Sequence, residues 1–490
     1  MNRNSSSEAS NLIARLRRAL GPCAVLSQKE DLKPYECDAL MLQRELPLAV
    51  ALPADETEVV AVLKLCREAA VPVIARGAGT GLSGGATPRP DAVLMSLARL
   101  NRILQVDPQA RVARVQPGVR NLAISEAAAS HGLYYAPDPS SQIACTIGGN
   151  VAENSGGVHC LKYGLTVHNI LALRAATIDG EVLAIGSGAL DSPGYDLLAL
   201  LTGSEGLLAV VTEVTVRLIP KPECARVVLA AFDSLVRAGQ AVADIIAAGI
   251  TPAGLELMDR ATSSAVEPFV HAGYPPEAEA ILLCESDGTM LEVQEEVARI
   301  EEVLHRAGAT ECRISRDEAE RTRLWAGRKA AFPALGALAP DYYCMDGSIP
   351  RKCLAPVLQA IRVMERRYGL RCANVFHAGD GNLHPLILFD ANIPDEVARA
   401  EAFGGAILEL CLRHGGSITG EHGVGVEKLN HMCLQFGAHE LGIFHGVKHA
   451  FDATGLLNPG KAVPTLHRCA EFGRLHVHAG QIPHPELPRF

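Results

Sequence analysis

Two histidines on either side of a tight turn are the first residues whose spacing suggests chemistry. His377 and His384 flank the Gly-Asp-Gly turn of the segment HAGDGNLHP. Facing residues of a hairpin have Cβ atoms about 5 Å apart, which suits two imidazoles that converge on one metal ion. Glu421, beside His422 in a glycine-rich segment, is the best candidate for a third ligand. Such a set with an open position fits a divalent ion such as Zn²⁺, Mn²⁺ or Fe²⁺. Histidines around a turn are also common as surface or hydrogen-bonding residues, so the pattern alone leaves both interpretations open.

A glycine-rich loop, GAGTGLSGGATP (77–88), follows a short apolar strand. By letter it matches the dinucleotide fingerprint G-x-G-x-x-G, which must open a helix whose N-terminus holds a pyrophosphate. Pro88 and Pro90 prevent a helix from running out of this loop. The sequence therefore excludes a Rossmann-type site here. What remains is a loop whose backbone N–H groups can approach an anion closely.

A second glycine-rich stretch, CTIGGNVAENSGGVHCLKYG (145–164), offers further amide and hydroxyl donors. Either stretch alone could be a cluster of turns. Two of them within one block of the chain indicate one long ligand that lies between them.

The elements that must position these residues follow from hydrophobic periodicity. Asp55 and Glu58 resemble a capping box that begins a helix, and helices are also expected over 122–131, 290–307 and 395–413. Strands are expected on both sides of the histidine turn, over 373–377 and 383–389. The sequence predicts an α+β protein with four parts, namely an N-terminal helical arm (1–46), a ligand-binding domain (47–222), a second domain (223–465) and a loose tail (466–490).

The overall composition excludes several classes of protein. The 490 residues carry 45 Lys and Arg against 55 Asp and Glu, and no basic stripe suggests a nucleic-acid partner. No stretch of 18 uncharged apolar residues exists, so we expect no transmembrane helix. The 14 cysteines are scattered and form no C-x-x-C pair, so we expect no iron–sulfur cluster within this chain.

Several longer motifs resemble those of the vanillyl-alcohol-oxidase-type flavoproteins, and in particular their D-2-hydroxyacid dehydrogenase branch. The resemblance extends from about residue 47 to 465. The motifs that carry it are PVIARGAGTGLSGG (72–85), PDPSSQIACTIGGNVAENSGG (137–157), KYG (162–164), LLTGSEGLLAVVTEVTVRL (200–218), HAGDGNLHP (377–385), GGSITGEHGVG (415–425) and GLLNPGK (455–461).

The resemblance implies FAD, held by a domain of two subdomains at 47–222, and an α+β substrate cap with a metal site at 223–465. By analogy, the 77–85 loop would wrap the pyrophosphate and the 137–157 stretch would line the isoalloxazine and ribityl chain. The turn at 204–206 would approach the adenosine end. The residues that the resemblance assigns to FAD are Arg76, Gly77, Ala78, Gly79, Thr80, Gly81, Leu82, Ser83, Pro137, Asp138, Thr146, Gly149, Asn150, Ala152, Asn154, Ser155, Gly156, Glu205, Gly206, Val211 and Asn458.

The resemblance also assigns roles in the cap. Its metal ligands correspond to His377, His384 and Glu421, and His422 would act as the general base for a hydroxyl proton. Arg328 corresponds to the family arginine that holds the substrate carboxylate, a task that suits a guanidinium. Without the resemblance, Arg328 would be interpreted as a solvated helix charge, and its neighbour Lys329 keeps that interpretation.

The implied reaction is the oxidation of a small 2-hydroxy acid, such as glycolate to glyoxylate. Related D-2-hydroxyglutarate enzymes carry an Asn and a Lys for a second carboxylate, where this sequence has Leu386 and Cys344. This departure favours a small monocarboxylate. The alternatives are a D-lactate dehydrogenase on the same scaffold and, from another class, a non-catalytic flavin-binding subunit.

The resemblance and the cysteine pattern together imply partner proteins. Electrons would leave through a separate iron–sulfur subunit toward a membrane quinone, in a hetero-oligomer that also contains a second flavin-type subunit. We therefore expect a cytoplasmic protein that its partner subunits can attach to the inner face of the membrane.

Overall fold

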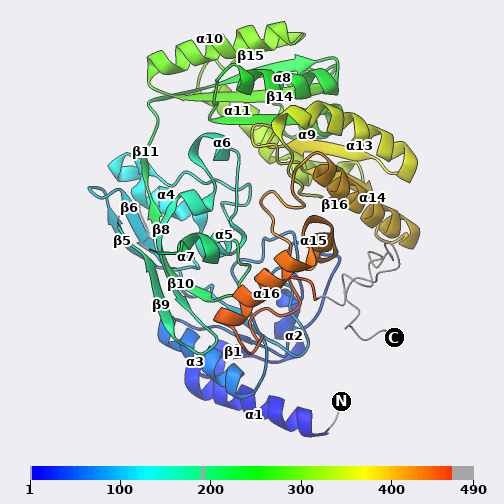
Figure 1. Cartoon of the computed structure of the whole chain (residues 1–490). Coiled ribbons are helices and arrows are strands. Elements are labelled where there is room, and N and C mark those ends of the chain that lie inside the picture. Colours follow the sequence, from blue (N-terminus) through cyan, green and yellow to red (C-terminus); the bar gives the residue numbers. More distant parts are fainter. Residues whose placement is uncertain (1–2, 189–193, 466–490) are drawn as a thin grey trace.

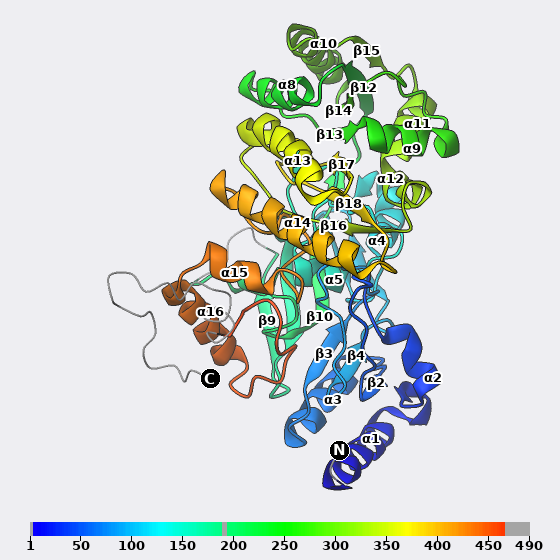
Figure 2. The same ribbon diagram turned by 90° about the vertical axis from the view of Figure 1, so that its right-hand side faces the viewer.

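The computed structural model describes residues 3–188 and 194–465. Figures 1 and 2 show a lower half built around two sheets and an upper half built around one larger sheet. The predicted α+β class, with a two-subdomain FAD-binding half and an α+β cap, is confirmed.

The first subdomain is a four-stranded sheet in the order β1-β2-β4-β3. The strands β2, β4 and β3 are parallel, and β1 joins β2 in the antiparallel direction. Helix α3 begins as expected, because the side chain of Asp55 accepts a hydrogen bond from the N–H of Glu58. The bounds are α1 Arg3–Leu20, β1 Val25–Leu26, β2 Ala49–Ala51, α3 Glu56–Glu68, β3 Val73–Arg76 and β4 Val93–Ser96.

The N-terminal helix belongs to this subdomain. Leu12 and Leu16 of α1 are buried in the same core cluster as Val59 and Val62 of α3. The described part of the predicted arm (1–46) is thus packed and paired with the first sheet. The sequence predicts that this segment is helical, but it does not show which surface buries the leucines of the helix.

The second subdomain is a five-stranded antiparallel sheet in the order β5-β6-β10-β8-β9. The helix expected over 122–131 is α4 with a following 3₁₀ turn, and Gly132 ends it in the left-handed conformation at φ 67°. The bounds are β5 Ile103–Asp107, β6 Val112–Val115, α4 Asn121–Ala128, α5 Ile147–Glu153, β8 Ile170–Ala176, β9 Val182–Gly186, α7 Leu197–Leu201 and β10 Val210–Arg217.

The cap is a seven-stranded sheet in the order β15-β12-β14-β13-β17-β18-β16, with every neighbouring pair antiparallel. Successive residues of β12 alternate between two core clusters, as a strand covered on both faces requires. The hairpin expected around the histidine turn is β17 and β18. The strand bounds are β12 Cys224–Phe232, β13 Gly254–Asp259, β14 Ala280–Gly288, β15 Glu311–Ile314, β16 Asp341–Cys344, β17 Cys372–Phe376 and β18 Pro385–Phe389.

Helices cover both faces of the cap sheet. One core cluster takes side chains from α8, α10, α13 and α14, and the other takes side chains from α9, α11 and α12. The helices expected over 290–307 and 395–413 are α10 and α14. The bounds are α8 Leu235–Ala247, α9 Arg260–Val270, α10 Met290–Arg306, α11 Glu318–Lys329, α12 Ala331–Ala334, α13 Leu354–Tyr368 and α14 Pro394–Arg413.

The chain then returns to the lower half, as Figures 1 and 2 show for α16. After α15 (Leu429–Gln435), Val447 and Phe451 of α16 (Ala438–Phe451) pack against the core of the second subdomain. Leu457 forms a parallel bridge with Val73 of β3. The range 223–465 is therefore not one body, because its last segment completes the FAD-binding half. The predicted tail (466–490) lies outside the described residues.

No helix of the described residues is long and apolar enough to cross a membrane.

The remaining elements are short and connect the two subdomains and the cap. The short elements are α2 Lys29–Leu32, α6 Cys160–Tyr163, β7 Leu133–Tyr134 and β11 Ile219–Pro220, with 3₁₀ turns at Pro22–Ala24, Lys33–Tyr35, Ala129–His131, Thr166–His168, Leu335–Ala337 and Arg351–Cys353.

Candidate active site

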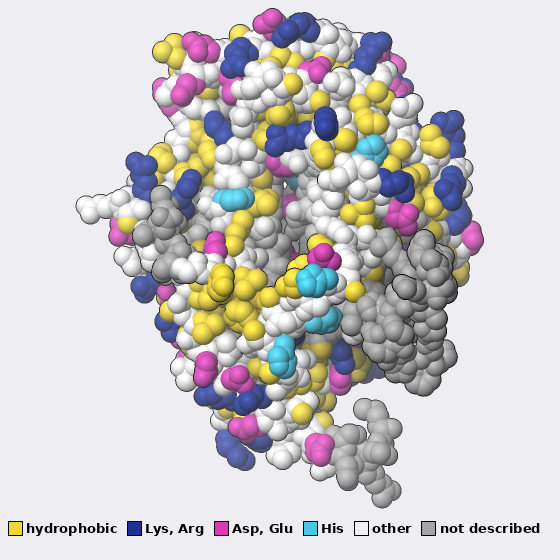
Figure 3. Space-filling model, viewed as in Figure 1, with side chains coloured by type: hydrophobic (Ala, Val, Ile, Leu, Met, Phe, Trp, Pro, Cys, Tyr) yellow, Lys and Arg dark blue, Asp and Glu magenta, His cyan; other side chains and the backbone are white. Residues whose placement is uncertain are grey.

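A cavity of about 380 Å³ is lined by residues of both halves. Figure 3 shows this face of the molecule hollowed between the upper and lower parts. In the lower half the walls are the glycine loop after β3, the segment that leads into α5, and the turn at 204–206. At the cap end the walls are Phe332, His384, Glu421 and His422. The two predicted ligand surfaces and the histidine–glutamate group thus meet in one space.

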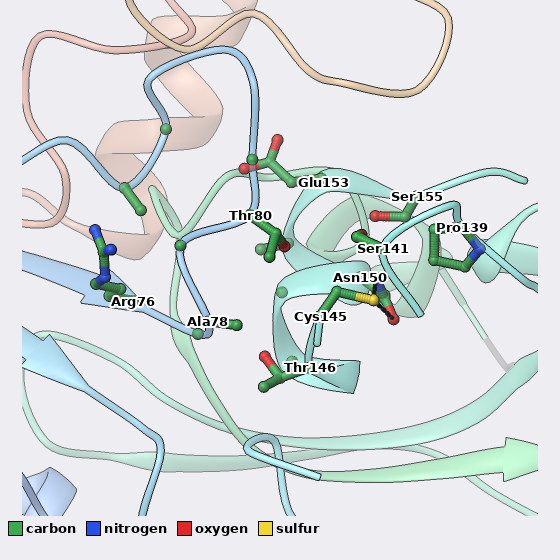
Figure 4. Close-up of a pocket in the computed structure, with 18 of the residues that line it drawn as sticks. Arg76, Ala78, Thr80, Pro139, Ser141, Cys145, Thr146, Asn150, Glu153 and Ser155 are labelled. Atoms are coloured by element: carbon green, nitrogen blue, oxygen red, sulfur yellow. Dashed lines mark hydrogen bonds between the residues drawn. The ribbon is translucent and has the colours of Figure 1, made fainter. Parts of the chain in front are cut away.

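The cavity gathers most of the residues predicted to bind the cofactor. Figure 4 shows the glycine loop on one side and the segment around α5 on the other. Those that line it are Arg76, Gly77, Ala78, Gly79, Thr80, Gly81, Leu82, Thr146, Gly149, Asn150, Ala152, Ser155, Glu205, Gly206 and Val211.

Six predicted cofactor residues do not line the cavity, although two of them, Asn458 and Gly156, lie against residues that do. The Nδ2 of Asn458 donates to the carbonyl oxygens of Gly85 (3.0 Å) and Glu205 (2.7 Å), so it joins two walls from behind. A Cβ on Gly156 would lie 2.5 Å from Glu421, so this glycine allows the close approach of the cap. The others are Ser83, Pro137, Asp138 and Asn154, with Asp138 held by His159 at 2.8 Å.

The polar lining residues of the 137–157 motif that were not assigned individually are Ser140, Ser141, Cys145 and Glu153. They lie inside the 137–157 motif, so only the neighbouring sequence could have indicated them. Glu153 is buried, and this burial raises the pKa of its carboxyl group well above the ordinary value. Figure 4 shows its side chain beside Thr80 at the cavity.

The structure explains the glycines at positions 77 and 81 of the loop differently. A Cβ on Gly77 would lie 2.4 Å from Oγ1 of Thr146, so glycine is needed there for the fold itself. A Cβ on Gly81 would find only Asp38, 4.0 Å away. Gly81 is therefore a wall position where protein packing does not demand a glycine. The Oγ1 of Thr146 is buried with no partner among the described residues, which fits a wall that receives a polar ligand.

The predicted metal ligands converge. Nε2 of His384 lies 2.9 Å and Nε2 of His377 lies 3.2 Å from the same oxygen of Glu421. One ligand atom from each residue lies within 4.8 Å of the others. The hairpin supplies both histidines, with ring centroids 5.0 Å apart. The donor set thus fits a divalent cation of borderline softness.

Glu256, on β13, holds His377 from behind. Its carboxylate lies 2.8 Å from Nδ1 of His377 and accepts a 2.7 Å hydrogen bond from Nε of Arg328. Burial would lower the pKa of His377, but the carboxylates of Glu256 and Glu421 outweigh it and raise that pKa to about 10. A carboxylate behind a histidine is a common way to orient a metal-binding imidazole. Sequence reasoning missed Glu256.

Arg328 is not a solvated helix charge, because its side chain is 1% exposed. It does not line the cavity but lies behind it, next to Glu256. Its Nη2 is buried and has no partner among the described residues. A buried guanidinium with one unused donor can hold an anion.

Asp346 fixes the loop that carries Glu421 and His422. Its carboxylate accepts hydrogen bonds from the backbone N–H groups of Gly420 (3.1 Å), Glu421 (3.1 Å) and His422 (2.9 Å). The buried ammonium of Lys428 lies 2.9 Å from the same carboxylate. Burial raises the pKa of Asp346, but its basic neighbours outweigh this, so the pKa lies below its ordinary value.

His422 closes the cap end of the cavity. Its ring stacks on that of His384 with centroids 4.9 Å apart and planes at 5°. Burial lowers the pKa of His422 to about 4, although the nearby Asp346 acts in the opposite direction. At neutral pH the ring is uncharged and can accept a proton, and its buried Nδ1 has no hydrogen-bond partner among the described residues.

Comparison with known proteins agrees with this geometry. Residues 47–186 match the FAD binding domain, and residues 221–462 match the C-terminal domain of FAD linked oxidases. The chain belongs to the FAD-linked oxidases. The resemblance to vanillyl-alcohol-oxidase-type flavoproteins is confirmed, and FAD is the cofactor of this chain.

Two relatives are similar to this chain in sequence, and one solved structure is similar in fold. The chain is 62% identical over 483 residues to glycolate oxidase subunit GlcD of Escherichia coli (strain K12), covering 99% of this chain and 97% of that protein. It is 33% identical over 454 residues to a D-lactate dehydrogenase of Anaerostipes hadrus, covering 91% and 95%. The structure of p-cresol methylhydroxylase with substrate bound has a TM-score of 0.79 at 18% identity, with 94% and 98% covered, and shows a shared fold.

A substitution at Gly81 tests whether the loop cradles the FAD of this oxidase. Gly81→Val should purify folded but with little flavin, because the added side chain meets no close protein atom yet narrows a wall of the cavity. Flavin absorbance per protein measures the outcome. Gly188→Val is the matched control, since Gly188 is also uncrowded and lies outside the cavity. Full flavin content in Gly81→Val would contradict the assignment.

A second substitution tests the metal ligands. His384→Ala should lose bound metal and hydroxy acid oxidation while keeping FAD, because the glycine loops that hold FAD belong to the other half. Elemental analysis and the flavin spectrum give the two readouts. The exposed His305 supplies the control variant His305→Ala. Unchanged metal content in His384→Ala would refute the ligand assignment.

A third experiment separates the structural and site roles of Asp346. Asp346→Asn should lower the melting temperature by several degrees, because it removes the nearer carboxylate partner of the buried Lys428 and leaves only Glu427, 3.8 Å away, where breaking a buried pair costs about 3–5 kcal/mol. The double variant Asp346→Asn/Lys428→Met should recover part of that stability but not the metal content, since the loop still lacks its carboxylate acceptor. Asp233→Asn, at a half-exposed surface ion pair, is the control. Normal metal content in the double variant would show that the loop does not depend on Asp346.

Proposed function

We propose that this chain oxidises glycolate to glyoxylate with FAD as the hydride acceptor. The observation that carries the proposal is that the FAD cavity ends on His384, Glu421 and His422. A substrate there would lie between the flavin wall and a set of groups suited to an alkoxide and a carboxylate. The identity to a glycolate oxidase subunit supports glycolate as the acid.

In the proposed mechanism the chain binds the acid and removes one proton. Nη2 of Arg328 is the unused donor for the substrate carboxylate. The uncharged His422 accepts the hydroxyl proton, so that the oxygen electrons can form the C=O bond while the hydrogen on C2 leaves as a hydride with its bonding electron pair. Bound FAD supplies the hydride acceptor, and a divalent ion held by His377, His384 and Glu421 would supply Lewis acidity. Asp346 and Glu256 act by orienting His422 and His377.

D-lactate is the alternative substrate on the same scaffold, and the D-lactate dehydrogenase relative supports it. A non-catalytic flavin-binding subunit is the alternative from another class. The convergence of the acid–base and metal-binding residues at the end of the FAD cavity argues against that alternative.

The proposal includes partner subunits. The Escherichia coli relative is a subunit of glycolate oxidase. The described residues contain no group of cysteines placed to bind an iron–sulfur cluster. We propose that electrons leave through a separate iron–sulfur subunit, with a second flavin-type subunit in the same assembly, and that these partners attach the protein to the cytoplasmic face of a membrane.

Anaerobic flavin bleaching tests the proposed reaction. The purified holoenzyme should lose its yellow absorbance when glycolate is added under nitrogen, because the hydride reduces the flavin. His422→Asn should bleach at least a hundredfold more slowly while keeping FAD, in line with the usual contribution of a general base. A wild-type holoenzyme that stays yellow with both glycolate and D-lactate would refute the proposal.

A substrate series tests the size of the acid. Cys344 and Leu386 face each other across β16 and β18 and are both buried in the apolar core of the cap. A second substrate carboxylate near them would be unpaired, at a cost of several kcal/mol. We therefore expect kcat/KM for glycolate and D-lactate to exceed that for D-2-hydroxyglutarate by about 10²-fold or more. Comparable values for D-lactate and D-2-hydroxyglutarate would show that another cation pairs with the second carboxylate.

A further inference from the structure

A second cavity, of about 240 Å³, lies against the cap end of the flavin cavity. It is lined by residues of α11 and by Asp138, Val158 and His159 of the FAD-binding half. Lys329 is the residue that lines both cavities. The two spaces therefore meet at one side chain.

One face of α11 forms the wall of this second cavity. Arg321, Trp325 and Lys329 follow each other at intervals of four residues, which places them in one row along the helix. Thr322, on the same helix, is exposed to solvent, and so is Lys329. The row thus runs from the molecular surface to the rim of the flavin cavity.

The other charges of the second cavity are already paired. Arg321 lies 2.8 Å from Glu285 and 2.7 Å from Glu318. His159 lies between Asp138 (2.8 Å) and Glu285 (3.2 Å). The side-chain ammonium of Lys329 makes no ion pair or hydrogen bond with any residue in the described ranges 3–188 and 194–465. It is thus the one lining cation there whose charge no described carboxylate compensates.

A positive charge at the entrance would help a small anion to approach this negatively charged protein. The chain carries a formal net charge of −10, and Glu421 lies on the wall that the anion must reach. FAD bound between the glycine loops would occupy that part of the cavity, so a substrate would need a separate approach to the His384–Glu421 end. We propose that the hydroxy acid anion reaches the flavin through the second cavity, and that Lys329 is the cation that draws it in.

The inference rests on the proposed function only in that the ligand is a small hydroxy acid anion. It goes beyond that function by assigning a route and a residue to the uptake step. Lys329 acts before the chemistry, and Arg328, buried behind the cavity, holds the carboxylate once it is bound.

The test follows binding of oxamate, a two-carbon monoanion with no oxidisable hydroxyl, by stopped-flow absorbance of the bound flavin. Lys329→Met should lower the association rate constant about fivefold at low salt, the effect of one close pair of unit charges in water. The difference from wild type should shrink at 0.5 M salt, where screening is strong. The dissociation rate constant should stay nearly unchanged. Lys329→Arg should behave as wild type.

Two further variants distinguish the effect of the Lys329 charge from the effect of the second cavity as a passage. Arg323→Met, on the exposed side of α11 and outside both cavities, makes the same change in net charge and should leave the association rate unchanged. Ala326→Leu narrows the second cavity, and it should slow association several-fold at every salt concentration. If Ala326→Leu does not fold, Thr322→Trp tests the same passage from its exposed rim.

The outcomes distinguish the possibilities. A wild-type association rate and salt dependence in Lys329→Met would overturn the role of Lys329, and so would an effect confined to dissociation. Normal association in a folded Ala326→Leu or Thr322→Trp variant would overturn the route. A wild-type protein that binds oxamate with these properties but bleaches with neither glycolate nor D-lactate would refute the proposed function and leave this inference standing.

Discussion

The site depends on one buried carboxylate, that of Asp346. It accepts hydrogen bonds from consecutive backbone N–H groups of the loop at 420–422 and pairs with the fully buried Lys428. Burying these two charges costs free energy, and their attraction offsets that cost only when the geometry is good. The pair therefore does more to fix a shape than to add stability. That shape presents Glu421 to the hairpin histidines and stacks His422 on His384.

The same loop joins the cap to the FAD-binding half. Just beyond His422, the N–H groups of Val424 and Gly425 donate to the carboxylate of Glu205, at 2.8 Å and 2.7 Å. Glu205 is also a wall of the flavin cavity. One short segment is thus held by an acid of the cap at one end and by an acid of the flavin domain at the other. A shift of either half would move His422 relative to the flavin.

The sequence predicted contacts between residues that are close along the chain, and it missed contacts between residues that are far apart. The hairpin that brings His377 and His384 together spans a few residues, and the glycine loops are continuous motifs. Asp346, by contrast, acts 76 residues away along the chain, and Glu256 acts 121 residues away. No period or spacing links such pairs, because only the packed sheet brings them together. Arg328 was indistinguishable from a surface charge for the same reason, since its burial depends on how α11 packs against the cap sheet.

The C-terminal return of the chain shows why the flavin site needs more than its own motifs. A glycine loop has few side chains with which to pack, so its backbone is costly to fix. Here hydrogen bonds to the backbone, rather than side-chain packing, fix the glycine loop. Nζ of Lys461 donates to the carbonyl oxygens of Gly85 (2.8 Å) and Thr87 (2.6 Å), and Asn458 bonds to Gly85 as well. Both residues lie far beyond the range 47–222 that was expected to hold FAD, although the resemblance had assigned Asn458 to the cofactor. The cap is therefore an insertion between two parts of one FAD-binding body, and this connection at both ends holds the substrate groups over the flavin cavity.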